Sequence, residues 1–312
     1  MHYKVMWQIF LMSLCVCAQG MKLPVSLKNS KQIEYHFNED LTNEDPTKIP
    51  TDASLPQVGD IFEGDIVMDN VLRSAILATN IKKSVVSSSM ENGPNRWPNA
   101  VIPYDFDSTL LPSNKEGILY AIAELDKFTC VRFVPRSLEH DNDFIRFTST
   151  KGGCSSSVGR QGGMQYVQLG NGCQRIGTVL HEMMHAIGFI HEQSRSDRND
   201  YVDVKFDNII TSLIGNFFMY SYGNINNLNV PYNYWSVMHY SNDAFSKNGK
   251  DTLVAKAAQD LKFGQRIQLS HLDVQQINQL YPCPHPKVNH YDVDYLIQNM
   301  TPDVVKKNNK QV

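Results

Sequence analysis

The alternation of apolar and polar residues becomes regular from about residue 100 and predicts short strands and helices. Val101-Ile102-Pro103-Tyr104-Asp105-Phe106 has strand composition, and Pro103, which lacks an N–H, favours a strand at a sheet edge. Apolar residues at helical spacing follow from Ile118 to Phe128. The sequence Ser113-Asn114-Lys115-Glu116 before them predicts a capping box. This part of the chain therefore predicts a strand followed by a helix.

The remaining predicted elements are strands and helices of ordinary length. They are strands at 131–134, at 144–147 and, as a candidate, at 164–169, and helices at 176–189 and 270–280. The last helix begins at Ser270 and stops before Pro282, because proline cannot continue a helix. Residues 195–265 are rich in Asn, Tyr and Gly and predict irregular structure.

The first twenty residues carry the pattern of a secretory signal peptide. A stretch of about 14 mainly apolar residues, 5–18, follows Lys4 and ends in the small-residue triplet Ala18-Gln19-Gly20. It is the longest apolar run in the chain and is shorter than the ~18 residues that a bilayer span needs. The alternative is a buried N-terminal helix. We expect a secreted, extracellular protein without a membrane span.

Residues 21–87 predict a pro-segment. They are polar and turn-rich, include the acidic stretch 38–46, and offer little that could bury a core, so they are expected to be extended or weakly structured alone. The small polar run Ser87-Ser88-Ser89 marks their end. The expected organisation is a signal peptide at 1–20, a propeptide at 21–87, one folded domain at 88–283 and a disordered tail at 284–312.

The charge balance excludes one class of function, and the cysteines indicate the redox compartment. The 312-residue chain carries 29 basic and 32 acidic residues, a net charge of −3, whereas a nucleic-acid-binding protein shows a basic face.

Cys15 and Cys17 would leave with the signal peptide. In an oxidising compartment the remaining cysteines are expected to form two disulfides, and sequence alone allows three pairings. These cysteines are Cys130, Cys154, Cys173 and Cys283.

A candidate metal site lies in the stretch from His181 to His191. On a helix, positions i and i+4 share a face, so His181 and His185 can bind one metal ion. Gly188 can adopt the left-handed conformation that ends a helix, and the turn lets His191 return as a third ligand. Three histidines leave the fourth zinc position open, as in catalytic rather than structural sites.

Glu182 occupies the position of a general base. It lies about 100° round the helix from His181, so it can reach a water near the metal without being a ligand. Two histidines and a glutamate can meet this spacing by chance on a surface helix, but the extension to His191 disfavours that reading. Met238 lies 47 residues after His191, within Ser236-Val237-Met238-His239-Tyr240. It matches the methionine turn of the metzincin zinc peptidases, where it would form a hydrophobic floor under the metal.

Among the metzincins, the chain resembles the astacin family from about Trp97 to Cys283. Residues 227–232 and Gly264-Gln265-Arg266 are most similar to the hatching-enzyme-like branch, although the extra N-terminal cysteine pair of that branch is missing from residues 84–100. The family markers are the histidine motif followed by Glu192-Gln193-Ser194-Arg195-Ser196-Asp197-Arg198, the stretch 129–136, Pro231-Tyr232-Asn233-Tyr234 and the methionine turn.

The resemblance implies an α+β, astacin-like fold of two lobes. The N-terminal lobe would hold a twisted, mostly parallel sheet with helices, the C-terminal lobe would be irregular, and one zinc ion per chain would lie in the cleft between them. The implied activity is a zinc metalloendopeptidase that cleaves proteins or peptides, and we expect a monomer. Glu182 would take a proton from zinc-activated water as general base, and Tyr240 would complete the resting zinc site beside the three histidines.

The resemblance also implies latency. Phe62-Glu63-Gly64-Asp65 matches the astacin F-x-G-D pattern, whose aspartate binds the catalytic zinc and displaces water. The alternative is a plain acidic turn. An activating protease would cut near residues 87–89, and the new N-terminus would then pair, through water, with Glu192.

Two further expectations come from the same resemblance. The disulfides would be Cys130–Cys283 and Cys154–Cys173. Arg266 would line the pocket for an acidic residue just after the scissile bond, because a guanidinium pairs bidentately with a carboxylate. There are two alternatives: Arg266 could be a solvated loop residue, or Lys262 could line the pocket in its place.

Two other functions remain as alternatives. The domain could be a catalytically dead peptidase kept for binding, although such proteins usually lose a ligand or the glutamate. It could also hydrolyse non-peptide amides or esters. Egg-envelope digestion, gut or venom proteolysis and matrix turnover are all compatible with the sequence as physiological roles.

Overall fold

The computed structural model describes residues 59–70, 72–73, 96–220 and 228–281. All of them lie in one compact unit, Glu34–Val312, while the other unit, Met1–Ile33, lies outside the described residues, as do the predicted signal peptide, tail and activation site. Within the described residues no helix is long and apolar enough to cross a membrane.

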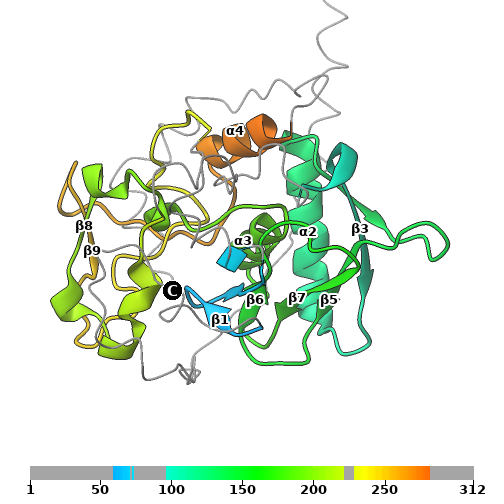
Figure 1. Ribbon diagram of the computed structural model, residues 1–312, viewed down its shortest axis with the longest axis horizontal. Helices are drawn as coiled ribbons and strands as arrows, with labels where there is room; N and C mark the ends of the chain where they lie inside the picture. Colours follow the sequence, from blue (N-terminus) through cyan, green and yellow to red (C-terminus); the bar gives the residue numbers. More distant parts are fainter. Residues whose placement is uncertain (1–58, 71, 74–95, 221–227, 282–312) are drawn as a thin grey trace, which may run out of the picture. The chain divides into compact units, whose positions relative to one another are not determined.

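A seven-stranded mixed sheet forms the framework (Figure 1). Four neighbouring strand pairs are parallel and two, β1 with β2 and β6 with β7, are antiparallel, so the α+β prediction with a mostly parallel sheet is confirmed. In spatial order the strands are β1 (Ile61–Phe62), β2 (Ile66–Val67), β6 (Cys154–Ser156), β7 (Met164–Leu169), β5 (Phe144–Thr148), β3 (Val101–Phe106) and β4 (Arg132–Pro135).

Helices pack on this sheet and close the main core. Helix α2 (Pro112–Phe128) and α3 (Ile176–Ala186) lie side by side, and α4 (His271–Leu280) joins the same core through Val274 and Ile277 (Figure 1). Helix α4 begins as predicted, because Ser270 and Asp273 form a complete capping box. Helix α3 ends three residues before the predicted Phe189.

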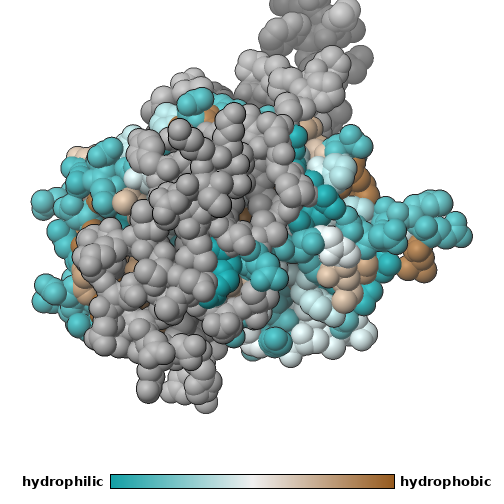
Figure 2. All heavy atoms as spheres, in the orientation of Figure 1, coloured by the Kyte–Doolittle hydropathy of each residue, from teal (hydrophilic) through white to brown (hydrophobic). Residues whose placement is uncertain are grey.

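The second half of the chain is irregular, as predicted, but has its own apolar core. A two-stranded antiparallel ribbon of β8 (Val202–Val204) and β9 (Leu253–Ala255), which the sequence pattern did not reveal, packs there with several aromatic rings. The described 3-10 helices are η3 (Pro98–Ala100), η4 (Glu192–Ser194), η5 (Arg198–Asp200), η6 (Phe206–Asn208) and η7 (Thr211–Phe217). Figure 2 shows mostly hydrophilic residues on the visible face, with hydrophobic residues in separate small patches.

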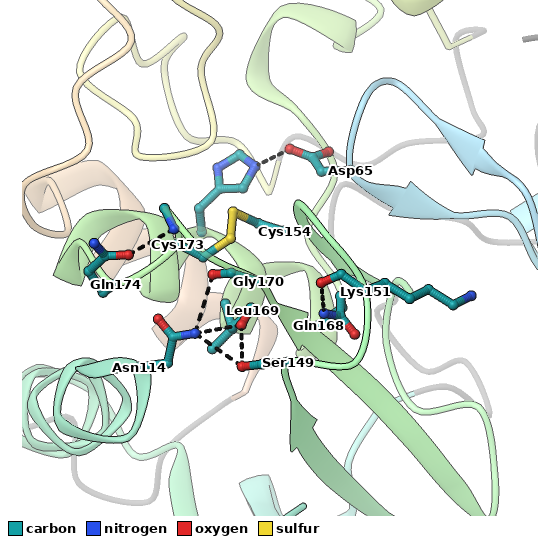
Figure 3. Close-up of a disulfide and its surroundings, with 12 residues drawn as sticks. Asp65, Asn114, Ser149, Lys151, Cys154, Gln168, Leu169, Gly170, Cys173 and Gln174 are labelled. Carbon is teal, nitrogen blue, oxygen red and sulfur yellow. Dashed lines mark hydrogen bonds and ion pairs between the residues drawn. A yellow bond between two sulfur atoms is a disulfide. The ribbon is translucent and has the colours of Figure 1, made fainter. Parts of the chain in front are cut away.

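Two local predictions were wrong. Strand β3 lies between β5 and β4 rather than at an edge; Pro103 is tolerated because pairing with β5 begins only at Tyr104. Helix α2 has no capping box: Leu111 is its N-cap, and Pro112 provides the first-turn geometry. The buried amide of Asn114 instead donates to the carbonyl oxygens of Leu169 and Gly170 (Figure 3).

The described part of the pro-segment is more structured than its composition suggested. Strands β1 and β2 extend the sheet through β6, with Ile66 opposite Ser156. Within the folded chain this segment buries apolar side chains, because their partners come from distant parts of the chain. The cluster that they form contains Phe62, Ile66, Met68, Leu72, Val158, Ile190, Phe218 and Tyr220.

One of the two expected disulfides is present among the described residues. Cys154 on β6 is joined to Cys173, with their Cα atoms 5.9 Å apart, ahead of α3 (Figure 3). The predicted link from Cys130 to Cys283 involves a residue outside the described chain. Cys130 Sγ lies 3.2 Å from the carbonyl oxygen of Tyr281, two positions before Cys283 in sequence.

Candidate metal centre

Three histidine side chains converge at the end of helix α3. His181 and His185 lie one turn apart on the helix, and both rings are buried. The chain leaves the helix at Gly188, whose φ of 115° only glycine adopts readily, and returns with His191, also buried. The Nε2 atoms of His181 and His191 are 3.3 Å apart.

Asp65, from the turn between β1 and β2, points its carboxylate into this cluster (Figure 3). Its Oδ2 lies 3.0 Å from Nε2 of His181, and its Oδ1 lies 3.1 Å from Nε2 of His191 and 3.5 Å from Nε2 of His185. One ligand atom from each of the four residues lies within 4.8 Å of the others. The structure thus brings the predicted latency residue together with the three predicted histidines.

The outer nitrogen of each ring is held by an acceptor, which fixes the orientation of the inner one. Nδ1 of His181 donates to the carbonyl of Val237, and Nδ1 of His185 donates to that of Phe189, each at 2.7 Å. Nδ1 of His191 donates instead to the Glu63 carboxylate, also at 2.7 Å. With Nδ1 protonated, each Nε2 presents a lone pair toward the cluster, as metal-binding histidines require.

The donor set fits zinc. Three imidazole nitrogens and one carboxylate oxygen are zinc ligands, and four of them suit its tetrahedral preference. Within the described residues, Nε2 of His185 and Oδ1 of Asp65 are buried and make no hydrogen bond. Buried polar atoms without partners are costly, so their convergence is the arrangement expected where a cation completes the site.

The charges of the metal-free cluster follow the same geometry. Burial lowers the pKa of His181 to about 3, reinforced by the positive charge of Arg266. Burial also disfavours charge on His191, but the carboxylates of Asp65 and Glu63 outweigh it and raise that pKa to about 9. The nearby histidines hold the pKa of Asp65 well below its usual value despite its burial.

Glu182 is buried beside the cluster. Its Oε2 has no hydrogen-bond partner among the described residues. Burial raises its pKa well above the usual range, and the charge of Asp65 adds to the effect. A carboxyl group in this environment accepts a proton readily, which is the property a general base requires.

The methionine turn contacts the histidines through Val237, whose carbonyl accepts from His181. Met238 is buried, and its carbonyl accepts the N–H of Glu192 at 3.2 Å. The ring of Tyr240 lies 4.7 Å, centroid to centroid, from that of His191. The Tyr240 hydroxyl donates to the main-chain carbonyl of Glu63.

Glu192 is buried behind the site. Its Oε1 accepts from Arg195 at 2.9 Å and from the N–H of Asn233 at 2.7 Å. Burial nevertheless raises the pKa of Glu192 to about 7. The predicted N-terminal partner of Glu192 lies outside the described residues.

Arg266 lies close to the site rather than in an exposed loop. Its Nη1 donates to the carbonyls of His239 and Gln265 at 3.0 and 2.9 Å, and its charge lowers the pKa of Glu182 against the effect of burial. Lys262 is exposed and pairs with Asp251 at 2.9 Å.

Three contributors to the site were not foreseen. Asp273 lies in the predicted first turn of the last helix, and its carboxylate also holds the methionine turn by accepting from Ser236 Oγ and Val237 N–H. His239, within the methionine turn, is buried, and its Nε2 accepts from the Tyr232 hydroxyl at 2.8 Å. Glu63 occupies the variable position of F-x-G-D, so the motif gave no signal for it.

Comparisons with known proteins agree with this geometry. A family model described as Astacin (Peptidase family M12A) matches residues 89–282. Zinc metalloproteinase nas-4 of Caenorhabditis elegans is 38% identical over 229 residues, which cover 73% of this chain and 71% of that protein. Zinc metalloproteinase nas-13 of the same species is 44% identical over 230 residues, 72% of this chain and 50% of that protein.

A solved structure is also similar. High choriolytic enzyme 1, a hatching enzyme zinc-protease from Oryzias latipes (medaka fish), is 39% identical, with a TM-score of 0.57 over 65% of this chain and 100% of that chain. The chain spans about half or less of the length of several curated relatives that it matches.

Proposed function

The chain belongs to the astacin family of zinc metallopeptidases, and we propose that it is the secreted zymogen of a zinc endopeptidase acting on proteins or peptides. The observation that carries the proposal is the convergence of Asp65 with His181, His185 and His191 at the end of α3. The three histidines would form the ligand set of a catalytic zinc site, and Asp65, from the pro-segment, would block that site.

The three histidines would hold zinc through Nε2, because their Nδ1 atoms are already committed to Val237, Phe189 and Glu63. When bound, the ion would lower the pKa of a water molecule and polarise the carbonyl of the scissile bond. His181 is fixed both by its place on α3 and by the Val237 carbonyl of the methionine turn, so its ring needs little reorganisation during the reaction.

Glu182 would carry the proton. Its buried carboxylate directly follows His181 in sequence and lies within the electrostatic reach of Asp65, so it can take a proton from the attacking water and return it to the leaving amine. Tyr240 would assist once the pro-segment has left. Its hydroxyl then loses the Glu63 carbonyl as acceptor and becomes free to donate to the oxyanion that develops on the substrate.

Asp65 would keep the enzyme latent. Its carboxylate occupies the space between the three Nε2 atoms, so water and substrate cannot reach the metal position. Burial of Phe62 and Ile66 on either side supports this placement. Cleavage near residues 87–89 by an activating protease would release the segment, and the new N-terminus would pair with Glu192.

The proposal is tested by activating the recombinant chain with trypsin and assaying unfolded protein and small esters in parallel. We expect protein cleavage that a metal chelator abolishes. Glu182→Ala should lose cleavage while retaining fold and zinc, whereas Glu139→Ala, at an exposed glutamate, should behave like the wild type. Cleavage by Glu182→Ala at the wild-type rate would contradict its role as base. Activity on esters alone would favour a non-peptide hydrolase. A chain that binds zinc but cleaves neither proteins nor esters would favour a binding protein.

A further inference from the structure

Glu63 is wholly buried, yet both of its carboxylate oxygens are engaged by residues of the peptidase domain. Oε2 accepts from Nδ1 of His191 at 2.7 Å, and Oε1 accepts from Oγ of Ser194 at 2.8 Å. Its main-chain carbonyl accepts from the Tyr240 hydroxyl. A buried carboxylate is stable only when it is paired and hydrogen-bonded, so these contacts specify where Glu63 lies.

The backbone around Glu63 is shaped for this contact. Glu63 has a φ of 49°, in the left-handed region that non-glycine residues seldom adopt, and Gly64 follows with a φ of 88°. Two consecutive residues in this region reverse the chain between β1 and β2. The reversal sends the Glu63 and Asp65 carboxylates to two sides of the same imidazole, at Nδ1 and Nε2 of His191.

His191 therefore differs from the other two histidines. The Nδ1 acceptors of His181 and His185 are main-chain carbonyls at Val237 and Phe189, which remain when the pro-segment is removed. The acceptor of His191 is a charged carboxylate, and it belongs to the pro-segment. A carboxylate at this position raises the basicity of the imidazole and fixes its orientation toward the metal.

We propose that Glu63 forms a carboxylate–histidine–zinc triad with His191 that exists only in the zymogen. The pro-segment thus acts on the metal twice, by Asp65 directly and by Glu63 through the third histidine. Removal of the segment leaves a zinc ion held by a less basic His191 and exposed to solvent and substrate. This inference rests on the proposed zinc site and deepens its regulation, since it makes Glu63 a positioning residue for metal retention.

Zinc affinity of the full-length zymogen, measured by competition with a chromophoric chelator, tests the triad. Glu63→Gln keeps the length of the side chain and an acceptor oxygen but removes the charge. We expect it to raise the zinc Kd by roughly ten- to a hundred-fold, the usual effect of losing such a partner. Asp60→Asn, which alters an exposed carboxylate three residues earlier in the same segment, should leave the Kd within about twofold of the wild type.

Two further measurements separate the triad from a purely anchoring role. If Glu63 acts on His191 itself, Glu63→Gln should still weaken zinc binding in an Asp65→Ala background and should move the NMR resonance of the His191 Nδ1 proton. No further loss of affinity in that background would show that Glu63 only holds Asp65 in place and would overturn the triad. A wild-type Kd in Glu63→Gln would overturn it as well, while leaving the zinc site itself intact. Failure of the wild-type zymogen to bind zinc would instead refute the proposed function.

Discussion

The carboxylate of Asp273 accepts the main-chain N–H of Val237 at 3.1 Å, and the carbonyl of the same Val237 accepts from Nδ1 of His181 at 2.7 Å. The first turn of α4 is thereby connected to the candidate metal ligand His181 on α3 through a single residue of the methionine turn. Asp273 also accepts from Ser236 and from the N–H of Ser270. These bonds make it the buried group that fixes this turn.

Replacing Asp273 tests that connection. In Asp273→Ala several buried donors lose their acceptor, so the free energy of unfolding should fall by on the order of 3 kcal/mol, measured by urea denaturation. Zinc affinity should fall too, because His181 loses the support of Val237. Gln279→Ala, on the exposed side of the same helix, should change neither quantity appreciably. A loss of stability with unchanged zinc affinity would show that the methionine turn holds His181 without Asp273.

Latency should depend on Gly64. A Cβ at this position would lie 2.8 Å from Cζ of Phe245, in the peptidase domain, and the residue has a φ of 88°. Gly64→Ala should therefore displace the neighbouring Asp65 and make the zymogen autoactivate faster, as followed by gel analysis of the processed form. Gly59→Ala has the same kind of φ, 95°, but meets no atom within 4 Å, so it isolates backbone strain from the clash. Equal rates for both variants would contradict a role for the contact with Phe245.

Specificity should depend on Arg266. If its guanidinium pairs with an acidic residue just after the scissile bond, Arg266→Ala should lower kcat/KM for Asp or Glu at that position far more than for Ala. A charge-assisted pair of about 1.5–3 kcal/mol corresponds to roughly a ten- to hundred-fold change in the ratio. Lys262→Ala, at an exposed lysine paired with Asp251, should leave the ratio unchanged. If Arg266→Ala lowers kcat/KM equally for all substrates, its bonds to His239 and Gln265 are its whole function.

The stability of the zymogen in acid should depend on Asp105. Hydrogen bonds from Arg146, at 2.7 and 2.6 Å, hold the pKa of this carboxyl below its usual value. A carboxyl with a lowered pKa stabilises the fold above its ordinary pKa, and the contribution disappears as pH falls through the lowered value. Asp105→Asn should thus be less stable than the wild type at pH 7, with the difference shrinking below about pH 4. In urea titrations across this range, the exposed control Asp207→Asn should show little difference at any pH.

Features of the site that depend on residues close in sequence were predictable. The spacing of His181, His185 and His191 follows from the pitch of a helix and one glycine turn, and the Ser270 capping box needs only four residues. A capping pattern can also mislead. The capping box predicted at Ser113 does not form, because the helix begins earlier, with Leu111 as its N-cap and Pro112 in its first turn.

The features that the sequence did not reveal join distant residues. Nothing near Asp273 indicates that Val237 lies beside it, and nothing in the composition of the pro-segment indicates that Ile66 pairs with Ser156. The sequence contains no indication of Glu63 for a different reason. Its role depends on the position of the His191 Nδ1 atom, which only the folded chain brings beside the Glu63 carboxylate. Local patterns therefore predicted the candidate ligands, while tertiary structure determines what supports them.

Metal analysis of the purified full-length chain, with and without His185→Ala, tests the central claim most directly. The wild type should contain one zinc per chain, and His185→Ala should lose most of it, because a ligand is removed from the centre of the cluster. His140→Ala, at a histidine whose side chain is 80% exposed, should keep the wild-type content. Stoichiometric zinc of normal affinity in His185→Ala would contradict the assignment of the site.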